Sequence, residues 1–177
     1  METAFPRLLR IHYAAIGEYD ATTGDVTNAN LIPGLFGGST ALILSGNALF
    51  VANFHGIVGK YDVTTGAVIN ANFITGLHEP SAFALFGNKL FVLEPPLAAV
   101  GEYDAVTGNV TNANLITGLS GSSFALASPG NILFVADRLL GTVSEYDPTT
   151  GALINANFIT GLRQPFGFIA APENHKK

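Results

Sequence analysis

A unit of about 42 residues is repeated four times along this chain of 177 residues. Its most constant part reads YDVTTGAVINANFITGL from residue 61 and YDPTTGALINANFITGL from residue 146. The same stretch begins, with a few substitutions, at Tyr19 and at Tyr103. A fixed period in the low forties predicts a repeat architecture, in which each unit is one small module that buries its apolar faces against its neighbours.

Each unit carries the turn signals of β-hairpins. The sequence Tyr-Asp-x-x-Thr-Gly places an Asp where its carboxylate accepts from backbone amides two or three residues later, and a Gly where φ must be positive. A second turn is marked by Gly-Asn before each Leu-Phe-Val run. In one unit these signals predict strands over 82–86, 90–93, 100–104 and 110–115. No window keeps a period of 3.6 residues, so we expect almost no helix.

Four short strands per unit at this period are typical of a β-propeller blade. We therefore expect an all-β fold, with residues 1–177 forming one β-propeller domain of four four-stranded blades. Residues 166–171 are predicted to be a first strand with no second strand after it, and residues 8–11 a second strand with no first strand before it. The N-terminal strand is expected to close the last blade, which leaves no open sheet edge. The alternative is that two chains join end to end into an eight-bladed ring.

The charge and composition of the chain exclude several classes of function. The net charge is −5, and the eight Lys and Arg residues do not cluster, so we expect no nucleic-acid partner. The absence of Cys excludes disulfides and thiolate catalysis. The apolar runs are too short to cross a bilayer, so we expect no membrane insertion. Residues 1–10 show no apolar core of signal-peptide length, so the compartment stays open.

The chain is unusually apolar for one without a membrane segment. Hydrophobic residues make up 48% of it and charged residues 12%, about half the usual charged share. Such a composition indicates dense packing or surfaces that another molecule covers. The second possibility predicts self-association, for example as a homodimer.

The repeat motifs resemble those of a known group of propellers. Gly-x-Tyr-Asp-x-x-Thr-Gly, then Asn-Ala-Asn-(Phe/Leu)-Ile, then Gly-Asn-x-Leu-Phe-Val-Ala, resembles the NHL-like β-propeller repeats of bacterial proteins. The resemblance covers essentially the whole chain and implies the propeller fold. Because many proteins with such repeats are secreted or surface-attached, it also implies an extracellular or cell-surface location. It implies no particular activity, because propellers host binding, scaffolding, hydrolysis and lyase chemistry alike.

The repeats differ from one another mainly in two loops per blade that share one face of a propeller. Loops on a rigid scaffold are the usual home of a binding site. Our first hypothesis is therefore a non-catalytic binding or scaffold module that recognises a protein or a carbohydrate through this variable face. The candidate ligand-binding residues on it are Phe54, His55, His78, Glu79, Leu139 and Arg163.

A second hypothesis is a metal site at the top of the central channel. The residues that follow the second strand of successive repeats are His12, Asn53, Glu94 and Asp137. They could converge on one divalent cation such as calcium, which prefers oxygen ligands. Gluconolactonase-like propellers hold a metal with carboxylate and Asn ligands there, so this alternative is a metal-dependent lactonase-like or lyase-like enzyme.

A third hypothesis is a self-assembling structural repeat protein.

We favour a binding protein without a cofactor over an enzyme and assign no catalytic residue. The chain has no HExxH spacing and no Gly-x-Ser-x-Gly motif, and no Gly-rich loop opens a helix.

Two polar motifs recur in every unit and are best explained by folding. The Asp of each Tyr-Asp turn is predicted to cap that turn, since one carboxylate is far fewer than the six to eight oxygen ligands of Ca²⁺. The Asn-x-Asn pairs lie on one face of a predicted strand, where we expect them to hydrogen-bond to neighbouring backbone. The functional alternative for these amides is binding to sugar hydroxyls. The pairs are Asn28/Asn30, Asn70/Asn72, Asn112/Asn114 and Asn155/Asn157.

Overall fold

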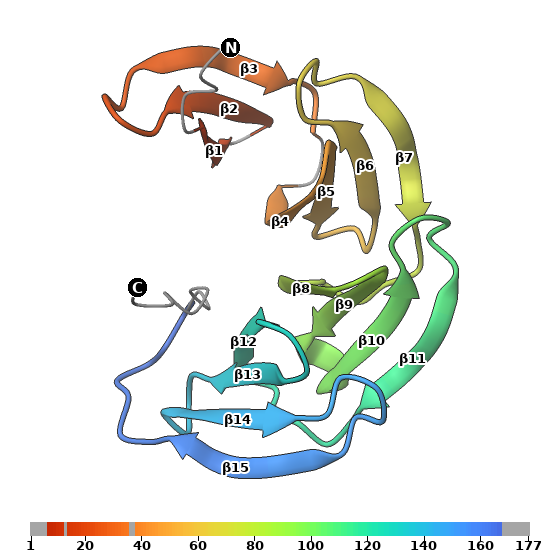
Figure 1. The fold of residues 1–177 in the computed structure, drawn as a ribbon, viewed down its shortest axis with the longest axis vertical. Helices are drawn as coiled ribbons and strands as arrows, with labels where there is room; N and C mark the ends of the chain where they lie inside the picture. Colours follow the sequence, from red (N-terminus) through yellow and green to blue (C-terminus); the bar gives the residue numbers. More distant parts are fainter. Residues whose placement is uncertain (1–6, 13, 36–37, 168–177) are drawn as a thin grey trace, which may run out of the picture.

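The computed structural model describes residues 7–12, 14–35 and 38–167, and these ranges form an all-β structure (Figure 1). Apart from strands they hold one short 3-10 turn, η1 (Pro95–Leu97), in agreement with the expectation of almost no helix. No helix in these ranges has the length and apolarity needed to span a membrane. The strands are β1 (Arg7–His12), β2 (Ala15–Asp20), β3 (Val26–Ile32), β4 (Ser39–Ser45), β5 (Ala48–Asn53), β6 (Val58–Asp62), β7 (Val68–Ile74), β8 (Ala82–Phe86), β9 (Lys89–Glu94), β10 (Ala99–Asp104), β11 (Val110–Ile116), β12 (Ser123–Ala127), β13 (Leu133–Asp137), β14 (Thr142–Tyr146) and β15 (Leu153–Ile159).

The strands form four antiparallel sheets, one for each repeat. Blade 1 contains β1 to β3, blade 2 β4 to β7, blade 3 β8 to β11 and blade 4 β12 to β15, and strands adjacent in sequence are adjacent in the sheet. The blades follow one another around a common centre, with β4, β8 and β12 innermost and β3, β7, β11 and β15 on the outer rim (Figure 1). The chain is thus a four-bladed β-propeller, as the period predicted. In blade 3 every predicted strand is within one residue of the observed one.

Blade 1 has three strands in the described part of the chain. Its first strand, β1, pairs along its whole length with β2, from Arg7 opposite Asp20 to His12 opposite Ala15. The expectation that β1 closes the last blade requires residues 166–171 as its partner strand. Residues 168–171 lie outside the described ranges, so this pairing stays a prediction.

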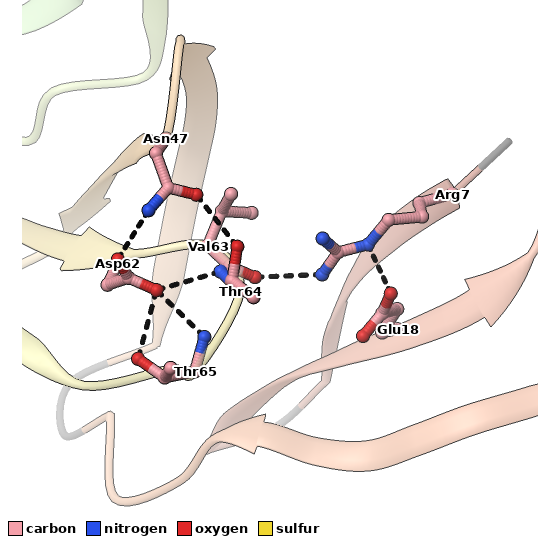
Figure 2. A network of polar contacts seen from close by, with 7 residues as sticks. All are labelled: Arg7, Glu18, Asn47, Asp62, Val63, Thr64 and Thr65. Atoms are coloured by element: carbon pink, nitrogen blue, oxygen red, sulfur yellow. Dashed lines mark hydrogen bonds and ion pairs between the residues drawn. The ribbon is translucent and has the colours of Figure 1, made fainter. Parts of the chain in front are cut away.

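The Tyr-Asp turns have the predicted capping geometry. In blade 2, Asp62 Oδ1 accepts hydrogen bonds from the amides of Thr64 and Thr65, at 2.9 and 2.8 Å, and from the Thr65 hydroxyl at 2.9 Å (Figure 2). Gly66 completes the turn with φ of 71°. In every turn the capping carboxylate accepts hydrogen bonds from the backbone amide three residues later and from the amide two residues later. These hydrogen bonds hold the pKa of the carboxylate below its ordinary value. The capping residues are Asp20, Asp62, Asp104 and Asp147.

The first Asn of each Asn-x-Asn pair also has a backbone partner. Asn70 Oδ1 accepts from the amide of Asn72 at 3.0 Å, and the same contact recurs in the other three blades. The pair lies where the register between the third and fourth strands shifts, for example between Val58 and Lys60 on β6. The amide side chain therefore stabilises a β-bulge, and the predicted hydrogen bond to neighbouring backbone is confirmed for these residues.

The hydrophobic core lies mainly between blades. The cluster between blades 1 and 2 contains Ile16, Ile32 and Leu49, while Phe73 and Leu90 belong to the cluster between blades 2 and 3. A third cluster joins blades 3 and 4. Each blade is therefore stabilised by its neighbours, as expected of a repeat whose single sheet cannot bury both faces.

Candidate functional site

The predicted ligand-binding residues all lie on one set of connections. We define the loop face as the connections from the second to the third strand and from the fourth strand to the next blade. Consecutive strands are antiparallel, so these connections lie at the same end of every blade. Each of the six residues is exposed on this face: Phe54, His55, His78, Glu79, Leu139 and Arg163.

The loops after the second strand present exposed apolar side chains in three successive blades. Phe54 of blade 2 is 60% exposed and Leu139 of blade 4 is 79% exposed, and the corresponding loop of blade 3 presents Leu97. Phe54 is held in place because its amide donates to the carbonyl of Gly38 at 3.3 Å. A Cβ added to Gly38 would lie 3.2 Å from the Phe54 ring, so this ring packs on the neighbouring loop. Phe54 is thus a fixed part of the face.

Blade 4 adds a pocket on the same face. A hollow of about 220 Å³ is lined by Ser122, Arg138, Leu139 and Gln164. The guanidinium of Arg138 lies 4.4 Å from the centre of the Phe166 ring, and its Nη2 donates to Gln164 Oε1 at 3.3 Å. An Arg stacked on an aromatic ring beside an exposed Leu is a combination typical of protein-binding surfaces.

His78 and Glu94, which belong to different sequence hypotheses, lie together. The backbone amide of His78 donates to Glu94 Oε2 at 2.7 Å, and His78 Nδ1 lies 3.5 Å from the same oxygen. Glu94 is buried, whereas the His78 side chain is exposed. The carboxylate therefore fastens the loop between blades 2 and 3 to strand β9.

The four residues proposed as metal ligands each make contacts within their own part of the ring. His12 Nε2 is hydrogen-bonded to the Tyr19 hydroxyl at 2.6 Å. Asn53 Oδ1 accepts from the amides of His55 and Ile57, at 3.0 and 3.1 Å. Asp137, the last candidate ligand, accepts two hydrogen bonds. Its Oδ1 accepts from the Leu140 amide at 2.7 Å, and its Oδ2 accepts from the Ser120 hydroxyl.

Through these contacts the candidate ligands stabilise the conformations of the loops. Among the described residues, no group of three or more His, Asp or Glu side chains is arranged to hold a metal ion. The divalent-cation site over His12, Asn53, Glu94 and Asp137 stays a prediction.

Two equivalent cavities open close to these residues, each between one blade and the connection that leads into it. One, of about 160 Å³, is lined by Leu35 of the connection into blade 2 and by Ser39, Asn53 and Tyr61 among others. The other, of about 230 Å³, lies against blade 4, and Ser123, Asp137 and Tyr146 occupy the corresponding positions there. The hydroxyl of Ser39 is buried without a hydrogen-bond partner in the described structure. Each cavity therefore offers hydroxyl, carboxylate or amide groups to a small polar molecule.

The tyrosines of these cavities are donors. Burial raises the pKa of Tyr61, and burial together with the Asp137 carboxylate raises the pKa of Tyr146. In blade 3, burial and then the charge of Glu94 raise the pKa of Tyr103 to about 12. These phenols stay protonated at neutral pH, so they can donate hydrogen bonds but do not act as general bases.

Several residues of the face were missed by sequence reasoning. Leu97 follows a Pro-Pro pair, and Arg138 follows the candidate ligand Asp137. Their sequence neighbours do not reveal that Leu97 is exposed or that Arg138 stacks on Phe166, which comes from the end of the chain. Tyr61 and its counterparts were noted only as part of the repeat motif. The spacing Gly-x-Tyr is a signal that could have identified them, since a Cβ on Gly59 would lie 2.6 Å from the Tyr61 ring.

Neither a protein-family model nor a curated protein matches this chain. Solved structures, in contrast, share its fold. The chain superposes over 90% of its length on 50% of the computationally designed Ika8 protein, with a TM-score of 0.65 and 19% identity. It superposes over 91% of its length on 64% of a chain in the nidogen/laminin complex, with a TM-score of 0.74 and 12% identity. For the designed Ika4 protein the shares are 77% and 81%, with a TM-score of 0.62 and 21% identity.

These neighbours are β-propellers, and at such identities they establish the fold alone. They do not single out the NHL-like repeats, so that finer resemblance is not confirmed. The chain spans about half the length of Ika8 and less than two thirds of the chain in the nidogen/laminin complex.

Proposed function

We propose that this propeller is a non-catalytic binding module whose loop face docks a protein partner. The observation that carries the proposal is the repeated exposure of large apolar side chains, Phe54, Leu97 and Leu139, on equivalent loops of three successive blades. A single exposed apolar residue is ordinary on a protein surface. Recurrence at the same end of adjacent blades, on loops that otherwise differ in sequence, favours a contact surface.

The blade 4 pocket supplies the proposed anchor point. Arg138 is already oriented by Phe166 and Gln164, so little side-chain freedom is lost when a partner packs against it. Leu139 projects beside this pocket and has most of its surface free to be buried. Protein interfaces concentrate their binding energy in such preorganised Arg and apolar groups. The protein partner in the nidogen/laminin structure is a fold-level analogy only.

The proposal is tested by selecting binders and mapping them. A phage-displayed random peptide library is panned on the immobilised chain, and the selected peptides are titrated against a Phe54→Ser/Leu139→Ser variant. We expect the variant to bind them at least about tenfold more weakly, because truncating a central apolar contact costs roughly 1–2 kcal/mol. The matched control is Val106→Ser, which removes an exposed apolar side chain from the opposite face. Equal binding to wild type and to the loop-face variant would contradict the proposal.

A carbohydrate ligand is the second candidate. It is favoured by the cavity on blade 2, which places hydroxyl, amide and phenol groups of Ser39, Asn53 and Tyr61 around one space. Binding of the wild-type chain on a glycan array, reduced by Tyr61→Phe and unchanged by Phe54→Ser, would select this candidate over a protein partner.

A further inference from the structure

The three interfaces between blades repeat one arrangement. The last two residues of the outer strand of one blade lie under the Tyr-Asp turn of the next blade, and they are at most 8% exposed. The three buried pairs are Leu31–Ile32, Phe73–Ile74 and Leu115–Ile116. Val63 of a Tyr-Asp turn and Ile32 of the preceding blade belong to the same buried cluster. The turn therefore acts as a cap over the preceding blade.

The turn glycine packs against the backbone of the preceding blade at each interface. A Cβ built on Gly66 would lie 1.7 Å from the carbonyl oxygen of Leu31, and a Cβ on Gly151 would lie 1.8 Å from that of Leu115. Gly108 makes the corresponding contact with the Phe73 carbonyl. Only a residue without a side chain lets the two backbones approach this closely. Each interface thus requires a glycine at this position of the turn as well as apolar side chains.

A cation from the preceding blade also reaches the turn. Between blades 1 and 2, Arg7 donates to the carbonyl of Val63 at 2.8 Å and forms an ion pair with Glu18 (Figure 2). Between blades 2 and 3, Lys60 donates to the carbonyl of Ala105 at 3.0 Å. These contacts satisfy carbonyl groups that the turn leaves without a ladder partner.

Blade 4 presents the same outer-strand surface with nothing over it in the described structure. Residues 155–162 have the same sequence, NANFITGL, as residues 70–77. Yet Phe158 is 48% exposed, whereas its counterpart Phe73 is 8% exposed. We call the surface of Phe134, Phe158 and Ile159 the tail face.

Blade 1 exposes the surface around its Tyr-Asp turn, which in the other blades packs against the preceding blade. Leu8 lies opposite Tyr19 just as Leu49 lies opposite Tyr61, but Leu8 is 54% exposed and Leu49 is fully buried. A Cβ on Gly24 of the blade 1 turn would meet no described atom within 4 Å. We call the surface of Leu8, Ala21 and Gly24 the head face.

We propose that the head face of one copy of this chain binds the tail face of a second copy, and that two such contacts close a ring of eight blades. The three internal interfaces are the precedent, because the two end faces carry the residue types that each internal interface joins. Contacts between unlike faces of two copies generate a closed ring when the rotation fits.

The match to half of a longer propeller chain favours a second copy over closure of one chain on itself. The chain matches 90% of its length to half of Ika8, a chain about twice as long. Its four blades therefore cover about half of a propeller chain that is about twice as long. This inference does not depend on the loop-face proposal.

The expected contact between copies lacks one element of the internal interfaces. Lys60 lies opposite Asn70 on the neighbouring strand, and the corresponding residue of blade 4, opposite Asn155, is Glu145. The described Lys and Arg residues of blade 4, Arg138 and Arg163, lie on the loop face, so no described cation of blade 4 takes the place of Lys60. Glu145→Lys should supply it and lower the dissociation constant of the dimer severalfold.

The first test is the mass of the native chain over a range of concentrations, measured by light scattering after size exclusion. We expect twice the mass of one chain. Leu8→Glu blocks the head face and Ile159→Glu the tail face, so each variant alone should be monomeric. Because Leu8 and Ile159 are exposed, both variants should fold. A 1:1 mixture keeps one intact head and one intact tail, so it should form dimers again.

The matched control is Val68→Glu, at a position that is exposed in every blade and should leave the dimer intact. A wild-type chain that is monomeric at all concentrations, an open series of larger species, or a mixture that stays monomeric would each overturn the proposal.

A cross-linking test separates the two ways of closing the ring. The chain has no Cys, so Ala21→Cys combined with Ile159→Cys introduces the only two thiols. The corresponding internal positions, Val63 and Ile32, share one buried cluster. We expect disulfide-linked dimers on non-reducing gels. A disulfide formed within single chains, giving a compact monomer, would show instead that the head and tail of one copy meet.

Discussion

The two faces of this propeller lie at opposite ends of the strands and serve different purposes. We call the face that carries the Tyr-Asp turns the turn face. On the turn face, Asp62, Thr65 and Gly66 recur almost unchanged in each blade and are occupied by hydrogen bonds and by backbone contact with the preceding blade. On the loop face, the equivalent connections differ in every blade and leave side chains such as Phe54 and Leu139 exposed. Residues that are repeated thus build the ring, and residues that vary are free to contact something else.

The comparison also explains why polar residues differ in meaning between the faces. The turn aspartates accept hydrogen bonds from amides two and three residues later in the same turn, so their role is structural. Glu94 and Asp137 of the loop face also fasten loops, but they do so beside cavities and exposed side chains. On the turn face the local sequence accounts for each carboxylate, whereas on the loop face the surroundings decide its role.

The largest expected effect comes from a glycine of the turn face. Gly66→Ala should destabilise the chain by about 2–4 kcal/mol, because Ala is strained at positive φ and its methyl group meets the Leu31 carbonyl. Gly76→Ala on the loop face has the same backbone requirement and open space, so it should cost only about 1 kcal/mol. Urea unfolding of both variants measures the difference. Equal losses would mean that the turn does not support the blade interface.

A smaller effect is expected from acid. Hydrogen bonds from the Thr65 amide and hydroxyl lower the pKa of Asp62 in the folded chain. The folded state therefore favours the ionised carboxylate. This stabilisation is complete above the ordinary pKa of Asp, near 4, and is lost as the pH falls through the lower folded pKa.

Asp62→Asn keeps an acceptor oxygen and removes the titration. Its melting temperature should fall less steeply than that of wild type between about pH 5 and pH 2. Thermal unfolding followed by circular dichroism checks this. The same slope for both proteins would show that the turn carboxylate is not linked to folding.

The smallest effect on stability is expected on the loop face. Phe54→Ser and Leu139→Ser should each change the free energy of unfolding by no more than about 0.5 kcal/mol, because their side chains are mostly exposed already. Differential scanning calorimetry of the two variants measures it. A loss above about 2 kcal/mol in either variant would place that side chain in the structural part of the molecule.

Much of the fold could be predicted because its signals are local and repeated. Gly-Asn and Asp-x-x-Thr-Gly mark turns, and the strands between them are short, so the boundaries of β8, β10 and β11 agree with expectation to within one residue. The candidate site was predicted less completely. Phe54 and Leu139 were identified from their variable loops, whereas the stacking of Arg138 on Phe166 joins residues 28 positions apart and has no periodic signal.

The sequence by itself determined the four units, their strands and their capped turns, because each depends on residues a few positions apart. Only the tertiary structure decided which copies of a motif are buried. Phe73 and Phe158 lie in the same stretch, NANFITGL, yet Phe73 is covered by the turn of the next blade and Phe158 is not. Burial is a property of the neighbouring blade, and identical local sequences therefore have different exposures at the middle and at the end of the arc.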